Sequence, residues 1–287
     1  MSALRELKIF AFVAIVVGIL YWGVEPLAHS VFHPKTAPAD FKFSDLEDLP
    51  TTGNVENGKV LATTYCVACH SIQRDGYPAL LTNDLAASAY GVVPPDLSNI
   101  GVIYDGKFLA NLIKDPVKAL KLTHKFNDTK PFPMTPTLVS DAELGDMVAY
   151  FKSLAADVQL SNKEIFEESC VRCHSVKYDK VVALTPSDTI VNYMGAKAPD
   201  LSMMIRSRGE ETLNKFINDP QKTLAGTSMP RVGLTQDSQE KVIAYLEKIG
   251  DSKKDQREFV GKILIGFMII MAILAYLWKR KIWHDLH

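Results

Sequence analysis

One hexapeptide pattern occurs twice in this chain and uses all of its cysteines. CVACHS occupies residues 66–71 and CVRCHS occupies residues 170–175, an offset of 104. In each copy two cysteines lie three positions apart, and a histidine follows the second cysteine directly. Because the chain has only these 4 cysteines, its fold must contain two equivalent Cys-x-x-Cys-His sites.

The sequence around each hexapeptide is also repeated, which is the first property to test in a chain of this length. At the same offset, the matching positions are Asp84 and Asp188, Gly91 and Gly195, the Pro-Asp-Leu-Ser segments at 95–98 and 199–202, and the Asp-Pro pairs at 115–116 and 219–220. The offset then falls to 95, where a shared Ala-Tyr pair lies at 149–150 and 244–245, so the first copy carries nine extra residues within KLTHKFNDTKPFP. The repeat predicts two homologous domains, residues 52–156 and 157–252.

Both copies have the periodicity of helices. NGKVLATTYC and KEIFEESC lead into the cysteines with apolar residues at helical spacing, and KFLANLIKDP and ETLNKFINDP end where Asp-Pro stops a helix. DAELGDMVAYFKSL and DSQEKVIAYLEKI keep the same period, and we expect Asp141 and Asp237 to be their N-caps. No alternating strand of any length occurs, so the predicted fold class is all-α. The short connection near 156–161 predicts that the two domains pack against each other.

Two apolar stretches flank the pair of domains. Residues 9–24 contain no charge, and residues 259–278 contain only Lys262. A helix of about 20 apolar residues crosses a bilayer, so we expect transmembrane helices within residues 1–28 and at residues 259–278. The first stretch also suits a cleavable signal peptide, and the alternative for the second is a buried core helix. Residues 29–51, which include prolines, are predicted to form a semi-extended linker.

Charge predicts how these helices are oriented. Arg5 and Lys8 precede the first apolar stretch, and three basic residues at 279–281 follow the second. By the positive-inside rule, both ends, including the basic tail at residues 279–287, lie in the cytoplasm, and the two domains lie across the membrane. The formal net charge of −1 provides no strong field that would recruit nucleic acid.

The hexapeptide pattern is typical of covalent attachment of a c-type haem. On a short helix the two sulfurs and the imidazole face one way, so the sulfurs can form thioethers while the imidazole reaches the iron. The predicted attachment residues are Cys66, Cys69, Cys170 and Cys173, and the predicted iron-binding imidazoles are those of His70 and His174. Zinc ribbons place their two pairs about 15–20 residues apart, and a thioredoxin-like motif needs a βαβ context. A structural disulfide is the remaining alternative in an oxidising compartment.

The repeat also predicts the sixth ligand of each iron, which in low-spin electron carriers is Met or His. Met134 and Met229 each lie 15 residues before the shared Ala-Tyr pair, in the loops PFPMTP and SMPR. No other methionine of either domain has a methionine counterpart, and we therefore predict these two as axial ligands. His124, where the alignment breaks, is the alternative ligand. A thioether ligand raises the reduction potential of a haem iron above that of an iron bound by two histidines.

Two further features of the sequence have open alternatives. The carbonyls of Pro95 and Pro199 are predicted to accept the second ring N–H of the ligand histidines, although a simple turn before a helix explains the same segments. Six lysines lie around the first Met loop: Lys107, Lys114, Lys118, Lys121, Lys125 and Lys130. They either steer an acidic redox partner or form a solvated helix face.

With CVACHS, PPDLS and PFPMTP in the first copy, and CVRCHS, APDLS and SMPR in the second, each domain resembles a class I cytochrome c. The pair resembles a di-haem cytochrome c with two covalently bound haem c groups. Two such domains ahead of a C-terminal anchor and a basic tail resemble the cytochrome c1 subunit of bacterial cytochrome bc1 complexes. The resemblance covers nearly the whole chain, but a typical cytochrome c1 carries one haem, so the second domain is a departure.

The resemblance implies a role in a respiratory chain of the bacterial inner membrane, with the haem domains on the periplasmic side. A Rieske iron–sulfur protein would deliver electrons, and a downstream cytochrome c or terminal oxidase would accept them. Quinol chemistry would belong to a cytochrome b subunit, so this chain would have no substrate site of its own. Two alternatives are the di-haem subunit of a high-affinity cbb3-type haem–copper oxidase, whose second domain normally ends the chain, and a di-haem peroxidase-like enzyme with one open iron.

Overall fold

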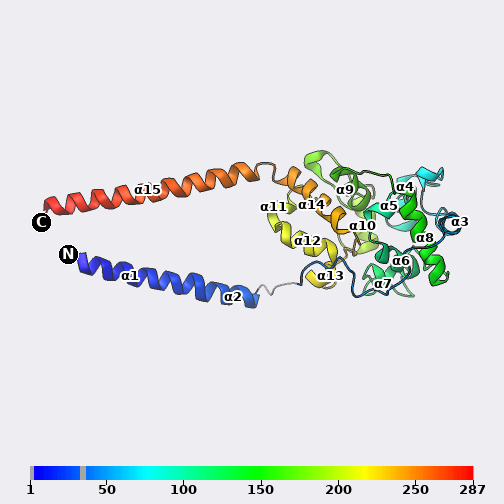
Figure 1. Cartoon of the computed structure of the whole chain (residues 1–287), viewed down its shortest axis with the longest axis horizontal. Coiled ribbons are helices and arrows are strands. Elements are labelled where there is room, and N and C mark those ends of the chain that lie inside the picture. Colours follow the sequence, from blue (N-terminus) through cyan, green and yellow to red (C-terminus); the bar gives the residue numbers. More distant parts are fainter. Residues whose placement is uncertain (1–2, 33–36, 287) are drawn as a thin grey trace.

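The computed structural model describes residues 3–32 and 37–286. Residues 1–2 of the predicted anchor, residues 33–36 of the predicted linker and residue 287 of the predicted tail lie outside the described residues. A globular part sits at one end of two long helices (Figure 1). Within the described ranges there is no β-strand, and pairing outside the helices is limited to isolated bridges such as that between Ile72 and Tyr77. The prediction of an all-α fold is confirmed.

The globular part consists of two domains that repeat one order of elements. The first contains α3 (Val55–Tyr65), η2 (Gln73–Asp75), α4 (Asn83–Tyr90), α5 (Ile100–Ile103), α6 (Gly106–Lys114), α7 (Pro116–Ala119) and α8 (Asp141–Leu154). The second contains α9 (Asn162–Cys170), η3 (Lys177–Asp179), α10 (Ser187–Met194), α11 (Met204–Arg208), α12 (Glu210–Asn218), α13 (Pro220–Thr223) and α14 (Gln236–Gly250). The elements correspond one to one, which confirms the two tandem domains predicted from the repeat.

The last helix of each domain begins with a hydroxyl cap. Ser140 and Glu143 form a reciprocal capping box at the start of α8, in which Glu143 Oε2 accepts the Ser140 N–H at 2.7 Å. Thr235 Oγ1 accepts the Ser238 N–H at 3.2 Å at the start of α14. The prediction that Asp141 and the equivalent aspartate of α14 are N-caps is therefore wrong. Both carboxylates lie in the first helical turn, where the helix dipole favours negative charge.

The first and last helices of each domain pack against each other. In the first domain Gly58 of α3 lies directly on the backbone of α8, because a Cβ at this position would overlap the carbonyl oxygen of Asp146. In the second domain the first and last helices meet through two aromatic rings. The ring centroids of Phe166 in α9 and Tyr245 in α14 lie 4.7 Å apart. These two crossings direct the chain into the hexapeptides, of which the first begins directly after α3 and the second begins at the last residue of α9.

Buried side chains of both domains form one continuous hydrophobic core. The backbone joins the domains as well: the Asp105 N–H donates to the Gly233 carbonyl at 3.0 Å, and the Thr235 N–H donates to the Ile103 carbonyl at 3.0 Å. Gly233 has a φ of +78° and lies against the ring of Phe108, which a Cβ at Gly233 would overlap. The two domains therefore pack against each other, as the short connection between them predicts.

The described part of the linker belongs to the globular part. Phe43 and Leu46 are 1% and 8% exposed, and the Phe43 ring lies 5.8 Å from that of Phe108. The Asp40 N–H donates to Asn218 Oδ1 of the second domain at 2.8 Å. Residues 37–49 thus contact both domains, which differs from the predicted spacer. Burial of two large apolar side chains stabilises this docked position.

The six lysines around the first Met loop bind other parts of this chain. Four of them pair with linker carboxylates: Lys107 with Asp48 at 2.6 Å, Lys114 and Lys118 with Glu47 at 3.0 and 3.6 Å, and Lys121 with Asp45 at 3.1 Å. Lys125 and Lys130 donate to the carbonyls of Met194 and Tyr193 at 3.0 and 2.6 Å. These lysines join the linker and the second domain to the first, a role that neither alternative from the sequence includes.

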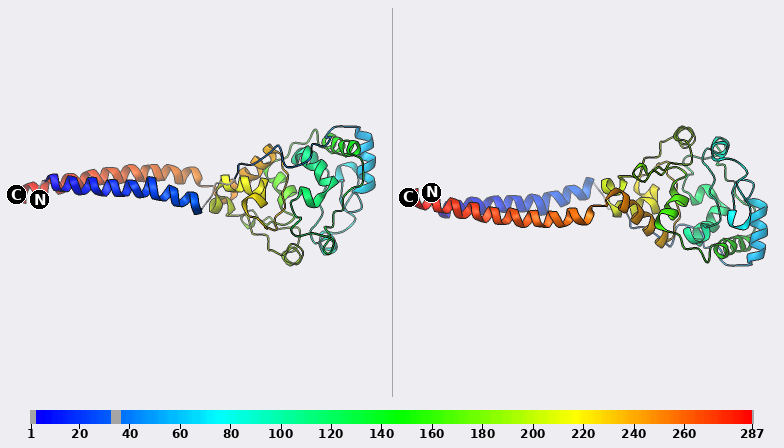
Figure 2. Two further views of the ribbon diagram at one scale, coloured as in Figure 1. Left: turned by 90° about the horizontal axis from the view of Figure 1, so that it is seen from below. Right: turned by 90° about the horizontal axis from the view of Figure 1, so that it is seen from above.

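Two apolar helical segments, Leu4–Phe32 and Lys254–His284, are long enough to cross a membrane. The first comprises α1 (Ala3–Ile19), the π-helical η1 (Leu20–Val24) and α2 (Glu25–Phe32), and the second lies in α15 (Lys254–Leu286). Both leave the globular part at the same end, and the two termini lie together at the far end (Figure 2). The apolar windows are 0% buried by the rest of the described chain, which excludes a core helix at residues 259–278.

The crossing of α3 and α8 gives a test of the packing in the first domain. Replacing Gly58→Ala should lower the free energy of unfolding by about 1–3 kcal/mol, because the added methyl group overlaps the α8 backbone. The higher helix propensity of alanine, worth about 1 kcal/mol, acts in the opposite direction. Thr64→Ala, at an exposed position of α3, is the matched control and should change stability little. Denaturant unfolding measures both, and equal stabilities would contradict this account.

Candidate functional site

Each hexapeptide forms a tight helical turn directly after a helix. Cys66 caps the C-terminus of α3, and its carbonyl accepts the N–H groups of Cys69 at 3.1 Å and His70 at 2.9 Å. In the second copy the Cys170 carbonyl accepts from Cys173 at 3.2 Å and His174 at 3.0 Å. Side chains at i, i+3 and i+4 of such a turn share one face. Two sulfurs and one imidazole are therefore presented together in each domain.

The second ring nitrogen of each histidine is bonded to the backbone. His70 Nδ1 lies 2.9 Å from the Pro95 carbonyl oxygen, and His174 Nδ1 lies 2.9 Å from the Pro199 carbonyl oxygen. A carbonyl can only accept, so Nδ1 carries the proton and donates, and the lone pair remains on Nε2. This tautomer is the one in which imidazole binds a metal through Nε2.

The Pro-Asp-Leu-Ser segments do more than turn the chain. The Leu97 N–H donates to the Ser71 carbonyl at 2.8 Å, Asp96 Oδ2 accepts the Gln73 N–H at 3.2 Å, and Ser98 Oγ accepts the Arg74 N–H at 3.1 Å. The second copy repeats the set: Leu201 with Ser175 at 2.9 Å, Asp200 with Lys177 at 3.0 Å, and Ser202 with Tyr178 at 3.1 Å. Each residue of the motif thus holds the hexapeptide or the turn that follows it.

A second repeated set was missed by reasoning from the sequence. A tyrosine of the last helix donates to a carboxylate that also pairs with a lysine of the first helix, and the equivalent sets are Lys59–Asp75–Tyr150 and Lys163–Asp179–Tyr245. Both hydroxyl-to-carboxylate distances are 2.9 Å. The lysine and aspartate positions match at the offset of 104. This offset was the signal that could have revealed them.

Burial at Cys66, Cys170 and the two histidines favours the uncharged forms of these groups. Burial raises the pKa of the Cys66 and Cys170 thiols to about 11, whereas zinc binding and thiol exchange use thiolates with a lowered pKa. No disulfide joins any of the four cysteines. Burial also lowers the pKa of His70 and His174, although their carbonyl partners oppose the shift. Thioether sulfurs and neutral imidazoles are the states that suit these positions.

Two buried donors lie where the domains meet beside the hexapeptides. Tyr104 Oη, from the first domain, and Arg172 Nε, from the second hexapeptide, have no hydrogen-bond partner among the described residues. The charge of Arg172 also contributes, after burial, to the lowered pKa of His70. A buried donor without a partner is costly, and haem carries two carboxylates that can accept from such donors. The residues present therefore fit a haem in this region.

The two predicted methionines lie at equivalent places of the repeat. Met134 is half-buried in the irregular segment between α7 and α8, and Met229 is half-buried in the segment between α13 and α14. Ser228 Oγ, next to Met229, donates to the Met194 carbonyl at 3.0 Å. The alternative ligand His124 places Nε2 3.1 Å from the Thr227 carbonyl oxygen, so its ring contacts the second Met loop.

The extra residues of the first domain cover part of the second site. Leu122 and Phe126 of this insertion are buried against Ile190 and Met194 of α10, and Cys173 packs beside them. Because α10 and Cys173 belong to the second domain, the insertion shields the second hexapeptide with side chains of the first. Sequence comparison located the insertion but could not show which domain it contacts.

The motif that holds each hexapeptide can be tested by mutation. Asp200→Ala removes the acceptor for the Lys177 and Ser202 N–H groups, at 3.0 and 3.1 Å, and should lower the free energy of unfolding by about 1–2 kcal/mol. The control is Asp188→Ala, an exposed acidic residue in the first turn of α10, which should lose less. Thermal unfolding of both variants provides the comparison. A larger loss for the control would show that the motif does not hold the second hexapeptide.

Comparison with known proteins shows the family of the two domains. The cytochrome c family model matches residues 55–155 and again residues 162–250. A solved structure described as a hyperthermophilic respiratory Complex III contains a chain that is 19% identical over 99% of both chains, with a TM-score of 0.32. The two family matches together cover more than half of the 287 residues. The chain therefore belongs to the cytochrome c family, and its domains are those of a c-type cytochrome with covalently bound haem c.

Proposed function

We propose that this chain is a membrane-anchored di-haem cytochrome that serves as the cytochrome c1-type subunit of a quinol–cytochrome c oxidoreductase. It receives electrons from a Rieske iron–sulfur protein, and it passes them to a downstream cytochrome c or a terminal oxidase. The observation that carries the proposal is the pair of hexapeptide turns, each with a histidine whose Nδ1 is 2.9 Å from a proline carbonyl.

The side chains have separate roles at each site. Haem attachment is assigned to Cys66 and Cys69 in the first domain and to Cys170 and Cys173 in the second. A haem bound at each hexapeptide supplies one-electron oxidation and reduction at its iron. The Nε2 atoms of His70 and His174 and the thioethers of Met134 and Met229 would hold the two irons. Neutral imidazole and thioether ligands favour the reduced iron, which suits a carrier at the oxidising end of a respiratory chain.

The placement of the domains supports a membrane-bound carrier. The two terminal helices leave the same end of the globular part (Figure 1), so a single bilayer can hold both. The basic residues at 279–281 and the N-terminal Arg5 and Lys8 lie at the far ends of these helices, which supports a cytoplasmic position for both termini. The haem domains then lie on the periplasmic side of a bacterial inner membrane. The second domain is nearer to the membrane, and the first is distal.

Two observations separate this proposal from its alternatives. The last helix of the second domain, α14, is followed after a short break by α15, which is 33 residues long, whereas the second domain of the cbb3-type oxidase subunit normally ends the chain. A di-haem peroxidase-like enzyme would leave one iron open to substrate. The presence of Met134 and Met229 at equivalent positions of the two domains favours two closed irons and a carrier.

The ligand assignment is testable with single substitutions. Met134→Ala and Met229→Ala should each leave covalent attachment intact, with a mass that includes two haems, because the cysteines are unchanged. Each variant should lose the Met–iron absorption band of one haem and lower the midpoint potential of that haem alone. The control is Met203→Ala, an exposed methionine (39%) without a counterpart in the first domain. Unchanged spectra and potentials in either loop variant would show that its methionine is not a ligand.

The assignment to a complex is tested by purification in mild detergent. We expect a Rieske protein and a cytochrome b subunit to co-purify with the intact chain, because a cytochrome c1-type subunit receives its electrons within the complex. Mass spectrometry identifies the partners. Co-purification with a copper-containing oxidase core would instead support the oxidase subunit, and peroxidase turnover by the isolated chain would support the enzyme.

A further inference from the structure

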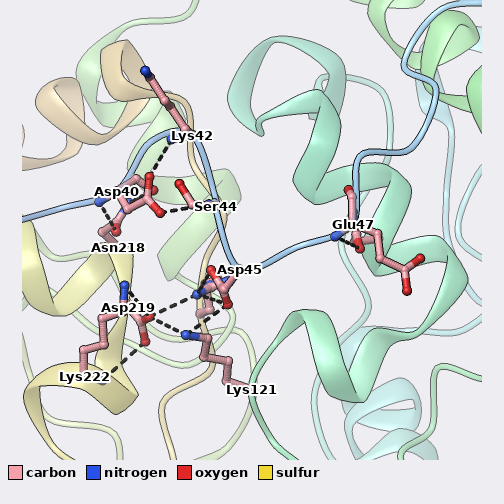
Figure 3. Close-up of polar contacts among 11 residues, drawn as sticks. Asp40, Lys42, Ser44, Asp45, Glu47, Lys121, Asn218, Asp219 and Lys222 are labelled. Atoms are coloured by element: carbon pink, nitrogen blue, oxygen red, sulfur yellow. Dashed lines mark hydrogen bonds and ion pairs between the residues drawn. The ribbon is translucent and has the colours of Figure 1, made fainter.

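A group of ion pairs joins the docked linker to both domains, and Figure 3 shows Asp45, Lys121 and Asp219 of this group. We call Asp45, Lys121, Asp219 and Arg231 the ion-pair cluster. Arg231 Nη2 donates to both carboxylate oxygens of Asp45 at 2.9 Å and to Asp219 Oδ2 at 3.0 Å. Lys121 Nζ lies 3.1 Å from Asp45 Oδ2 and 2.5 Å from Asp219 Oδ2. Lys121 and Arg231 thus share both carboxylates, and Lys222 Nζ adds a contact to Asp219 Oδ2 at 3.7 Å.

The four members of the cluster come from four separate segments. Asp45 belongs to the docked linker, and Lys121 belongs to the insertion of the first domain. Asp219 is the N-cap of α13 in the second domain. Arg231 lies two residues after Met229. The cluster therefore connects the segment that leads to the N-terminal anchor with the loop that carries the proposed iron ligand.

The cluster is buried on one side only, because the side chains of Asp45 and Lys121 are 38% and 24% exposed. The side chains of Arg231 and Asp219 are 2% and 4% exposed, and the Arg231 guanidinium lies 5.6 Å above the ring centroid of Phe43. The pair between Arg231 and Asp219 is buried, so the loss of either partner is strongly destabilising. Loss of the Asp45 charge leaves Arg231 paired with Asp219 but removes the two hydrogen bonds that orient the guanidinium toward the linker. Burial by itself would raise the pKa of Asp45, but Arg231 and Lys121 outweigh it and hold this carboxyl in its charged form.

The Met229 loop is held on both sides of the methionine. On one side Ser228 Oγ donates to the Met194 carbonyl at 3.0 Å, and on the other the Arg231 N–H donates to the Leu120 carbonyl at 3.1 Å. The ion-pair cluster adds a third attachment through the Arg231 side chain. Because only Pro230 separates Met229 from Arg231, a shift of the guanidinium moves the backbone that positions the methionine sulfur.

The first domain has no equivalent of this cluster. Met134 is followed by Thr135 and Pro136, so no arginine occupies the position that Arg231 holds in the second loop. Asp115 is the repeat equivalent of Asp219 and likewise caps a helix, accepting the Lys118 N–H at 3.1 Å. Within the described ranges, Asp115 forms no salt bridge, whereas Asp219 pairs with Lys121 and Arg231. The repeat therefore provides an internal control.

We propose that Asp45 is a positioning residue that acts through Arg231 to hold the Met229 sulfur against the iron of the second haem. The linker from the N-terminal anchor thereby takes part in the ligand geometry of the domain that lies farther along the chain. This inference rests on the proposed assignment of Met229 as a ligand. Asp45 lies in the linker, outside the two repeated domains, and is inferred to act on the second site alone.

The test uses the full chain with both haems bound and the substitution Asp45→Asn, which keeps the shape of the side chain and removes its charge. We expect the Met–iron band of one ferric haem to weaken or vanish. The midpoint potential of that haem should fall by at least about 59 mV, a tenfold change for a one-electron couple. The other haem should keep its band and its potential. Asp45→Glu, which restores the charge, should recover part of the band.

Two controls separate positioning from a general loss of stability. Asp48→Asn removes a linker carboxylate whose side chain is 95% exposed, and Asp115→Asn changes the repeat equivalent of Asp219 while keeping a cap. Neither should alter the bands. If Asp45→Asn cannot be recovered with both haems, Lys121→Met is measured instead. Because Arg231 still pairs with Asp45 in that variant, a smaller loss at the same haem is expected.

The outcomes distinguish the inference from the assignment on which it depends. Met229→Ala is measured alongside, and retention of both bands in that variant would show that Met229 is not a ligand. Loss of a band in Met229→Ala, with wild-type bands and potentials in Asp45→Asn or in its substitute Lys121→Met, would overturn the positioning role alone. Equal changes at both haems in the Asp45 variant would also overturn it, because a loss of stability would then explain the result.

Discussion

Each site of this protein depends on a backbone carbonyl that accepts the Nδ1 proton of a histidine. The contact between His70 and Pro95, and its equivalent between His174 and Pro199, both at 2.9 Å, decide the tautomer and leave Nε2 available for iron. The proline carbonyl is held in place as the acceptor because the aspartate, leucine and serine that follow the proline form hydrogen bonds with the hexapeptide and the next turn. A short motif thus holds each imidazole in one orientation and one tautomer.

The two domains share this motif but have diverged where they meet. The insertion of the first domain covers α10, and its lysines bind the linker or the second domain. Arg172, inside the second hexapeptide, contributes its charge to the surroundings of His70. Arg231 has no counterpart after Met134. Duplication therefore accounts for the two sites, while these single-copy residues join the domains into one electron carrier.

Most of the candidate site could be predicted from the sequence, because the repeat compares each residue with an independent copy. It identified the hexapeptides, the proline carbonyls and the two methionine loops without reference to the fold. The same comparison also contains the lysine and aspartate that contact the shared tyrosine of each last helix, but these matches were not noticed. The aspartates are Asp75 and Asp179. The N-caps of α8 and α14 were misplaced, because serine and threonine compete with a neighbouring aspartate for the same backbone N–H groups.

By itself the sequence determined the helices, the tandem order of the domains and the two Cys-x-x-Cys-His turns, since these depend on local spacing and side-chain chemistry. Only the tertiary structure decided where the linker lies, since Phe43 and Asp45 find their partners on both domains. It likewise decided that the six lysines are used within the chain. Such contacts join segments distant in sequence and occur once, so neither periodicity nor the repeat records them.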